Sequence, residues 1–189
     1  TRDKFETKLW RGQSFSLNHN EVSQLHCLEN INQLERVTES ALDSDLCIVF
    51  GTRKIHKKTI EQLPSLTVNL HGGDPELYRG LDSHLWSIWH QDKRGLKTCL
   101  HLLSAELDEG SILEMQTLDM NNIDALFELR AVNTALCVDL CNRLLDKLAT
   151  GKKLEPKVQK NIGHYYSFMP SELKENVVKR FQSYKETLS

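Results

Sequence analysis

The 189-residue sequence lacks the features of several common protein classes. No run is long and apolar enough to span a membrane, and the first residues have no apolar core of a signal peptide. The formal net charge is only -2 and the basic residues form no stripe, which argues against a nucleic-acid binder. The five cysteines are odd in number and have no framework spacing, so we expect reduced core thiols. These absences favour a soluble, cytoplasmic protein with one sizeable core.

Nucleotide and metal motifs are missing as well. The sequence contains no G-x-G-x-x-G motif and no P-loop. Cys137 and Cys141 lie four residues apart on a predicted helix, but no histidine or carboxylate cluster nearby completes a metal site. The spacing of a second conceivable set matches no common metal-hydrolase motif; its members are His71, Asp74, His84, His90 and Asp108. We therefore predict that the protein uses no metal.

The alternation of apolar segments predicts an α/β fold. Strands are predicted at 45–50, 66–70, 97–103 and 111–118. Helices are predicted at 32–43, 57–63, from an N-cap at Asp82, at 122–148, and from Ser171 to about Tyr184. The first strand is apolar throughout, which is typical of a strand buried on both faces. This order indicates a Rossmann-like, mostly parallel sheet with helices on both faces.

The most informative segment is 67–80, TVNLHGGDPELYRG, which is followed about thirty residues later by LDEG at 107–110. Asn69 and His71 are two residues apart at a strand end, so their side chains project to the same face. Asp108 lies in a turn after a later strand. An amide N–H can stabilise an oxyanion, an imidazole can move a proton near neutrality, and a carboxylate can orient that imidazole. The trio is a candidate for acyl-transfer chemistry. Alternatively, its polar groups only form hydrogen bonds that complete the end of a strand.

These motifs, with Tyr-Arg-Gly at 78–80 and a helix containing Trp86, resemble the formyltransferase family that uses 10-formyltetrahydrofolate. The resemblance covers about 43–148 and implies the formyltransferase fold, with Asn69, His71 and Asp108 as catalytic residues. Segment 69–84 looks most like sugar N-formyltransferases of the GDP-perosamine type, which modify lipopolysaccharide O-antigen precursors. It departs from the methionyl-tRNA enzymes, whose motif has His-Pro/Gly-Ser-Leu-Leu-Pro before the Arg-Gly.

The resemblance also implies binding residues. The loop after the 45–50 strand and the segment before Asp108 would hold the pterin from two sides; the candidates are Lys54, Ile55, His56, Ser104, Ala105, Glu106 and Leu107. Taken without the resemblance, the first of these is an ordinary strand-to-helix loop. Substrate-binding candidates are Asp74, Tyr78, Arg79, Asp82 and His84. Arg79 suits a phosphate through its planar guanidinium, but a loop-packing role is equally open.

The family's fold begins with a strand, a helix and often a second strand, whereas residues 1–22 are polar and predict no buried strand. We expect a catalytic domain over 1–150 that lacks its first strand or strands, and a C-terminal helical extension over 151–189. The aromatic segment 163–170 of that extension would pack on the domain, contact substrate or form a dimer interface. The resemblance implies a homodimer through such C-terminal elements.

The leading hypothesis is one-carbon transfer from 10-formyltetrahydrofolate to the primary amine of a nucleotide-linked amino sugar, without nucleic acid or membrane as partner. Three alternatives stay open. The protein could be a 10-formyltetrahydrofolate hydrolase, which would keep the same trio. It could formylate another amine, on methionyl-tRNA, glycinamide ribonucleotide or an amino acid. It could also be a non-catalytic remnant or binding domain.

Overall fold

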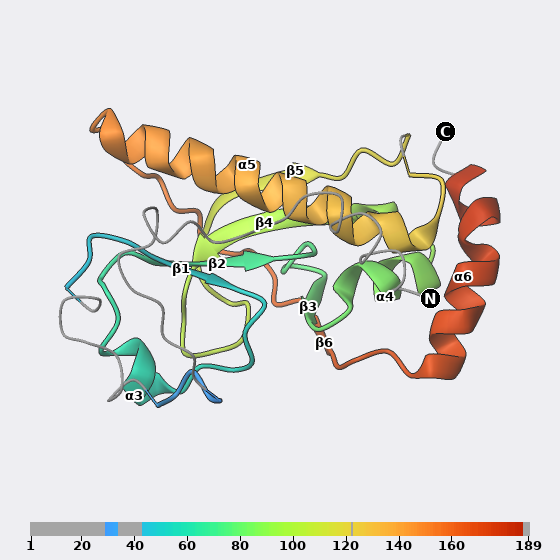
Figure 1. Cartoon of the computed structure of the whole chain (residues 1–189), viewed down its shortest axis with the longest axis horizontal. Helices are drawn as coiled ribbons and strands as arrows, with labels where there is room; N and C mark the ends of the chain where they lie inside the picture. Colours follow the sequence, from blue (N-terminus) through green and yellow to red (C-terminus); the bar gives the residue numbers. More distant parts are fainter. Residues whose placement is uncertain (1–28, 34–42, 122, 187–189) are drawn as a thin grey trace.

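The computed structural model describes residues 29–33, 43–121 and 123–186 (Figure 1). Most of the helix predicted at 32–43, and all of residues 1–22, lie outside these described residues. None of the helices within the described ranges has the length and apolarity that crossing a membrane requires.

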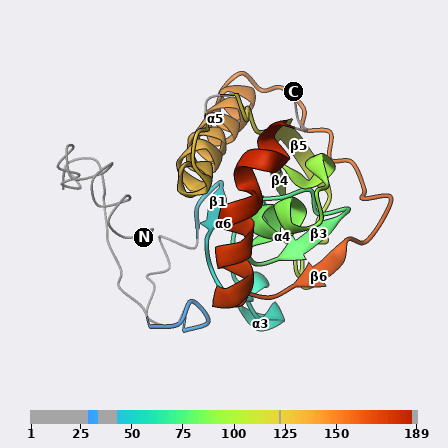
Figure 2. The same cartoon turned by 90° about the vertical axis from the view of Figure 1, so that its right-hand side faces the viewer.

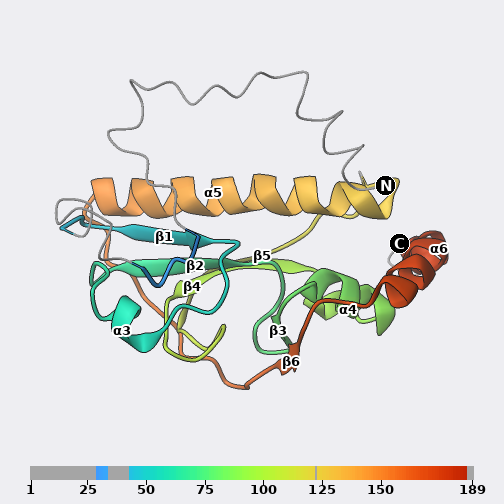
Figure 3. The ribbon, with the colours of Figure 1, turned by 60° about the horizontal axis from the view of Figure 1, so that its bottom comes forward.

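Four strands form the main sheet, in the order β1 (Cys47–Phe50), β2 (Thr67–His71), β4 (Lys97–Leu102) and β5 (Ile112–Thr117). Every predicted strand is present, but the prediction of a mostly parallel sheet is wrong for the described residues. β1 runs parallel to β2, whereas the β2–β4 and β4–β5 pairings are antiparallel. Residues 103–111 join β4 to β5, and this connection is shorter than the crossover that a parallel pair of neighbouring strands needs. The connection from β2 to β4 passes through α4 (Ser83–Trp89), which lies at the end of the sheet and does not cross its face (Figure 3).

Strand β1 is not buried on both faces, contrary to the prediction. Val49 is buried, but Ile48 and Phe50 are 41% and 50% exposed. Among the described strands β1 pairs with β2 alone, so it is an edge strand there. A run of apolar residues identifies a strand, but whether its second face is covered depends on what packs there.

Helix α5 (Leu129–Ala149) covers one side of the sheet, while the short helix α3 (Lys57–Ile60) lies on the other (Figure 3). Three α5 residues pack on three strand residues in one core cluster: Cys137, Leu140 and Leu144 against Val68, Leu70 and Leu100. The helix begins later than predicted, because the short 3-10 helix η3 (Leu126–Glu128) precedes it. It ends as predicted, before Thr150 and Gly151.

A second core lies beyond the sheet, where α4 meets α6 (Ser171–Glu186) and the start of α5 (Figure 2). Ile88 of α4 and Phe181 of α6 are buried there, close to Leu96, which follows the 3-10 helix η2 (Lys93–Gly95). The aromatic segment 163–170 contributes to a second, two-stranded sheet. It contains strand β6 (His164–Tyr166), which pairs in parallel with β3 (Tyr78–Gly80). The C-terminal segment therefore packs within the chain itself.

Candidate functional site

Asn69, His71 and His101 lie on the face of the sheet that points away from α5. Their neighbours Leu70 and Leu100 belong to the core under α5, and successive side chains of a strand alternate between faces. Asn69 and His101 are direct partners in the β2–β4 register. The two-residue spacing of Asn69 and His71 thus places both side chains on one face, as predicted.

Asp108 completes this polar cluster from the turn between β4 and β5. Its Oδ2 lies 3.5 Å from His71 Nδ1 and accepts a hydrogen bond from the Gly80 N–H at 2.8 Å. Its Oδ1 lies 3.4 Å from Asn69 Nδ2 and 3.6 Å from His101 Nε2. The three residues predicted to be catalytic therefore lie together, and His101 joins them. We call these four residues the polar cluster.

The hydrogen bonds fix which way the side chains of the polar cluster point. His101 Nδ1 lies 2.8 Å from the Leu102 carbonyl oxygen, so this nitrogen is the donor. In the neutral ring Nε2 is then an acceptor, and it receives the Asn69 Nδ2–H at 3.1 Å. His71 Nε2 likewise donates to the Tyr78 carbonyl at 2.8 Å. In neutral His71 the Nδ1 lone pair therefore faces Asp108.

Burial and local charge set the protonation states of His71 and Asp108. Burial lowers the pKa of His71 below 6.5, and the negative charge of Asp108 offsets only part of that effect. Burial raises the pKa of Asp108, but the neighbouring His101 and His71 rings and the Gly80 N–H outweigh it and hold that pKa below its usual value. At neutral pH the cluster consequently holds a neutral imidazole beside a carboxylate.

His101 was not among the predicted site residues. The available signal is a histidine between two leucines, Leu100 and Leu102, in a predicted strand. In the structure the ring is only 1% exposed. The strand register places His101 opposite Asn69, where its ring can accept a hydrogen bond from the Asn69 amide. β3, α4 and η2 lie between β2 and β4 in the chain, so no hairpin turn fixes that register locally.

Two glycines allow the loops around the cluster to approach closely. Gly80 has a φ of 89°, and a Cβ there would overlap the carbonyl oxygen of Tyr166. Its N–H can therefore reach Asp108 while β3 stays paired with β6. At Gly73 a Cβ would lie 2.8 Å from His71 Nε2, so a side chain there would displace the imidazole.

The two segments predicted to hold the pterin lie next to each other. Lys54 Nζ is 3.8 Å from Glu106 Oε2, and both side chains are largely exposed. Ile55 is buried, whereas His56 is exposed and its N–H donates to Asn32 Oδ1 at 2.7 Å. In the second segment the Ser104 hydroxyl donates to the Glu106 carbonyl at 2.6 Å. Of the neighbouring residues there, Ala105 is exposed and Leu107 is half-buried.

Three of the substrate-binding candidates are engaged in contacts within the chain. Asp74 is buried and pairs with Lys97 at 2.8 Å. His84 is buried and donates through Nε2 to the Lys97 carbonyl at 2.6 Å. Burial lowers the pKa of His84 to about 4. Asp82 precedes α4 as predicted, but its carboxylate does not cap that helix. It pairs instead with Lys174 at 2.7 Å.

Tyr78 and Arg79 also have partners within the chain. The Tyr78 hydroxyl donates to Asp92 at 3.3 Å, and burial raises the pKa of that hydroxyl. Arg79 Nε donates to the Gly163 carbonyl at 2.7 Å, and its Nη1 bonds to Glu109. These contacts fit the loop-packing role that the sequence left open for Arg79.

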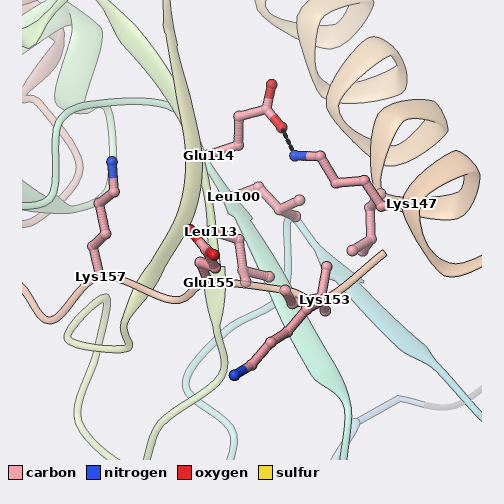
Figure 4. A pocket seen from close by; sticks show the side chains of 9 residues that line it. Leu100, Leu113, Glu114, Lys147, Lys153, Glu155 and Lys157 are labelled. Carbon is pink, nitrogen blue, oxygen red and sulfur yellow. Dashed lines mark hydrogen bonds and ion pairs between the residues drawn. The ribbon is translucent and has the colours of Figure 1, made fainter. Parts of the chain in front are cut away.

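A cavity of about 280 Å³ opens between β4, β5, the last turns of α5 and residues 153–157 (Figure 4). Lys147 and Glu114 form an ion pair at 2.8 Å in its wall. Leu100 lines this cavity, while the next residue, His101, belongs to the polar cluster. Because successive strand residues point to opposite faces, the cavity and the polar cluster lie on opposite sides of the sheet. In the part of the chain that the structure describes, no group of three or more His, Cys, Asp or Glu residues could hold a metal ion.

Neither a family model nor a curated protein matches the sequence. Solved structures do match. The formyltransferase PseJ from Anoxybacillus kamchatkensis superposes with a TM-score of 0.60 at 22% identity, over 75% of this chain and 72% of that one. A 4-N formyltransferase from Francisella tularensis gives 0.60 at 18% identity, over 88% of this chain and 72% of the other. This chain has the formyltransferase fold.

The formyltransferase fold also occurs in an N-formyltransferase from Helicobacter canadensis, which matches with a TM-score of 0.54 at 18% identity. That match covers 68% of this chain, which spans about half (48%) of the other. The PseJ structure contains UDP-4,6-dideoxy-4-formamido-L-AltNAc and tetrahydrofolate, and the Helicobacter structure contains folinic acid and dTDP-3-aminofucose. At the level of the fold, these matches confirm the resemblance that the motifs indicated.

Proposed function

We propose that this protein transfers the formyl group of 10-formyltetrahydrofolate to the primary amine of a nucleotide-linked amino sugar. The observation that carries the proposal is the polar cluster of Asn69, His71, His101 and Asp108 on a formyltransferase fold. Two proteins with this fold are known in complex with a folate and a sugar nucleotide, which supports the same pair of ligands here.

Asn69 is suited to stabilise the oxyanion that forms when the amine attacks the formyl carbon. Its Nδ2 carries two N–H bonds, and His101 accepts one of them at 3.1 Å. The other faces Asp108 at 3.4 Å, a long contact that a formyl oxygen would replace. A donor held in this way needs no reorganisation during the reaction, and such donors contribute about 10²–10³-fold in rate.

His71 and Asp108 are suited to move the proton of the attacking amine. Anchoring of Nε2 to the Tyr78 carbonyl directs the basic Nδ1 of His71 toward Asp108, 3.5 Å away. The amine proton passes to His71, directly or through water, and the Asp108 carboxylate stabilises the resulting imidazolium. As the C–N bond to the folate breaks, the same proton moves to the departing N10, so the site returns to its starting state.

The segments around Lys54 and Glu106 would hold the pterin, as the resemblance implies. Their contact at 3.8 Å brings two stretches from different parts of the chain to one place. The Glu106 segment leads directly into the polar cluster, because Leu107 precedes Asp108, and the Leu107 carbonyl accepts a hydrogen bond from Arg79 at 3.2 Å. Backbone groups of these segments are then the natural partners for the edge of a pterin ring.

The test is an assay of the full-length gene product with 10-formyltetrahydrofolate and a panel of UDP-, dTDP- and GDP-linked amino sugars. Mass spectrometry follows the formamido product. We expect Asn69→Ala and His71→Ala to lower kcat by about 10²–10⁴-fold. Asn121→Ala, which changes an exposed asparagine, is the matched control and should behave as wild type. If the two site variants are as active as this control, the mechanism is wrong.

The same assay separates the alternatives. Formate release without any amine acceptor would indicate a hydrolase. Product formation only with methionyl-tRNA, glycinamide ribonucleotide or an amino acid would place the activity on another amine. Calorimetric binding of the folate without turnover of any acceptor would indicate a non-catalytic binding domain.

A further inference from the structure

Hydrogen bonds from the C-terminal segment 159–163 fix the turn that carries Asp108. Gln159 Nε2 donates to the carbonyl oxygen of Asp108 and to that of Gly110, both at 2.8 Å. One side-chain amide thus binds the backbone on both sides of Glu109. The turn belongs to the β4–β5 connection, whereas Gln159 comes from the chain beyond α5.

Further bonds tie segment 159–163 to the loop that follows His71. The Glu76 carboxylate accepts the backbone N–H groups of Lys160 and Asn161. At the other end of the segment, the Gly163 carbonyl accepts from Arg79, which also bonds to the Leu107 carbonyl. Segment 159–163 therefore connects the loop that follows His71 with the turn that carries Asp108.

The turn needs such support because of its backbone conformation. Asp108 has a φ of 57°, and a non-glycine residue in this left-handed region costs on the order of 1–3 kcal/mol. In this conformation the carboxylate faces His71 and Asn69. The Gln159 Oε1 is buried and has no hydrogen-bond partner among the described residues. A buried oxygen without a hydrogen-bond partner costs free energy. The two hydrogen bonds donated by Nε2 therefore account for a glutamine at this position better than its packing does.

We propose that Gln159 is a positioning residue for Asp108, so that the C-terminal segment helps to set the geometry of the candidate catalytic carboxylate. The kinetic part of this inference rests on the proposed function. Without the two hydrogen bonds that Gln159 donates, which we call the clamp, the turn relaxes and Asp108 moves away from His71. The His71–Asp108 pair, which accepts the amine proton, is then disrupted. Misplacement of a catalytic group by about 1 Å can cost about 100-fold in rate.

Gln159→Leu removes both donors and keeps a similar volume. Its matched control is Gln182→Leu, because Gln182 also donates to a backbone carbonyl, that of Asp124, at 2.6 Å on α6. We expect kcat of Gln159→Leu to fall about 10-fold or more, with KM for the folate changed less than about threefold. The control should keep wild-type values.

Two further measurements do not depend on activity. Hydrogen exchange in peptides covering 104–112 should become faster in Gln159→Leu and stay as in wild type in Gln182→Leu. The His71 pKa, followed by imidazole NMR signals, should fall. The charged and titratable groups that face His71 are Asp74, His84, His101 and Asp108. Of these only Asp108 sits on the released turn, and its charge is the largest of the effects that raise the pKa of His71, ahead of the Tyr78 carbonyl and Asp74.

The outcomes separate the clamp from the proposed function. If wild type formylates no amine but Gln159→Leu still shows faster local exchange and a lower His71 pKa, the clamp stands and the proposed function fails. If wild type is active and Gln159→Leu matches Gln182→Leu in kcat, exchange and His71 pKa, the clamp is wrong. Should Gln159→Leu not fold, Gln159→Asn takes its place, since its amide is one methylene too short to span both carbonyls.

Discussion

Burial of His84 should make the stability of this protein fall as the pH drops below 6.5. The ring is buried, Nε2 donates to the Lys97 carbonyl, and burial lowers the pKa to about 4 in the folded state. The unfolded chain has the ordinary value near ~6.5 and binds the extra proton more readily. The stabilising contribution is therefore complete above pH 6.5 and is lost progressively between pH 6.5 and 4. The gap between the two pKa values corresponds to about 3 kcal/mol.

The variant that isolates this effect is His84→Gln, which removes the titration but keeps a side-chain amide donor for the Lys97 carbonyl. Urea unfolding at pH 7 and pH 4.5, followed by circular dichroism, measures the free energy of unfolding of both proteins. Wild type should lose about 2–3 kcal/mol more than His84→Gln between these pH values. His71 titrates in both proteins, so only its electrostatic coupling with His84 enters the difference.

His164→Gln, at an exposed position, is the control for the exchange of a histidine for glutamine as such. An identical loss of stability in wild type and His84→Gln would refute the reasoning. The same variant tests the substrate role that the sequence suggested for His84. A structural histidine predicts an unchanged KM for the sugar nucleotide at pH 7.5, whereas a raised KM would indicate contact with substrate.

Two further predictions concern the support of the site. His101→Phe keeps a buried ring but removes the acceptor that fixes the Asn69 amide, so kcat should fall about 10-fold or more with little change in circular dichroism; a wild-type kcat would show that Asn69 needs no such partner. Gly80→Ala should destabilise the protein by more than about 2 kcal/mol in urea unfolding, because the new methyl group overlaps the Tyr166 carbonyl at positive φ. Gly51→Ala has a similar φ but open space around the Cβ position, so a loss as large as that of Gly80→Ala would contradict this explanation.

The direction of the strands illustrates what residue patterns cannot supply. The strands predicted at 66–70 and 97–103 are confirmed as β2 and β4. Their antiparallel pairing depends on the path of the chain between them, through β3 and α4 at the end of the sheet. Alternating strands and helices favour a parallel sheet only where the helix crosses the sheet face. The exposed residues Ile48 and Phe50 make the same point for burial, since apolar character does not reveal what covers a face.

For the candidate site, the sequence by itself determined the features that depend on near neighbours in the chain. Asn69 and His71 share a face because side chains alternate along a strand, and the motifs around them already indicated a formyltransferase. The tertiary structure decided which distant groups meet that pair. His101 comes from the strand register, Gly80 from the β3–β6 pairing, and Gln159 from the C-terminal segment. The physical reason is that such contacts join residues tens of positions apart, and they form only when the whole core brings those segments together.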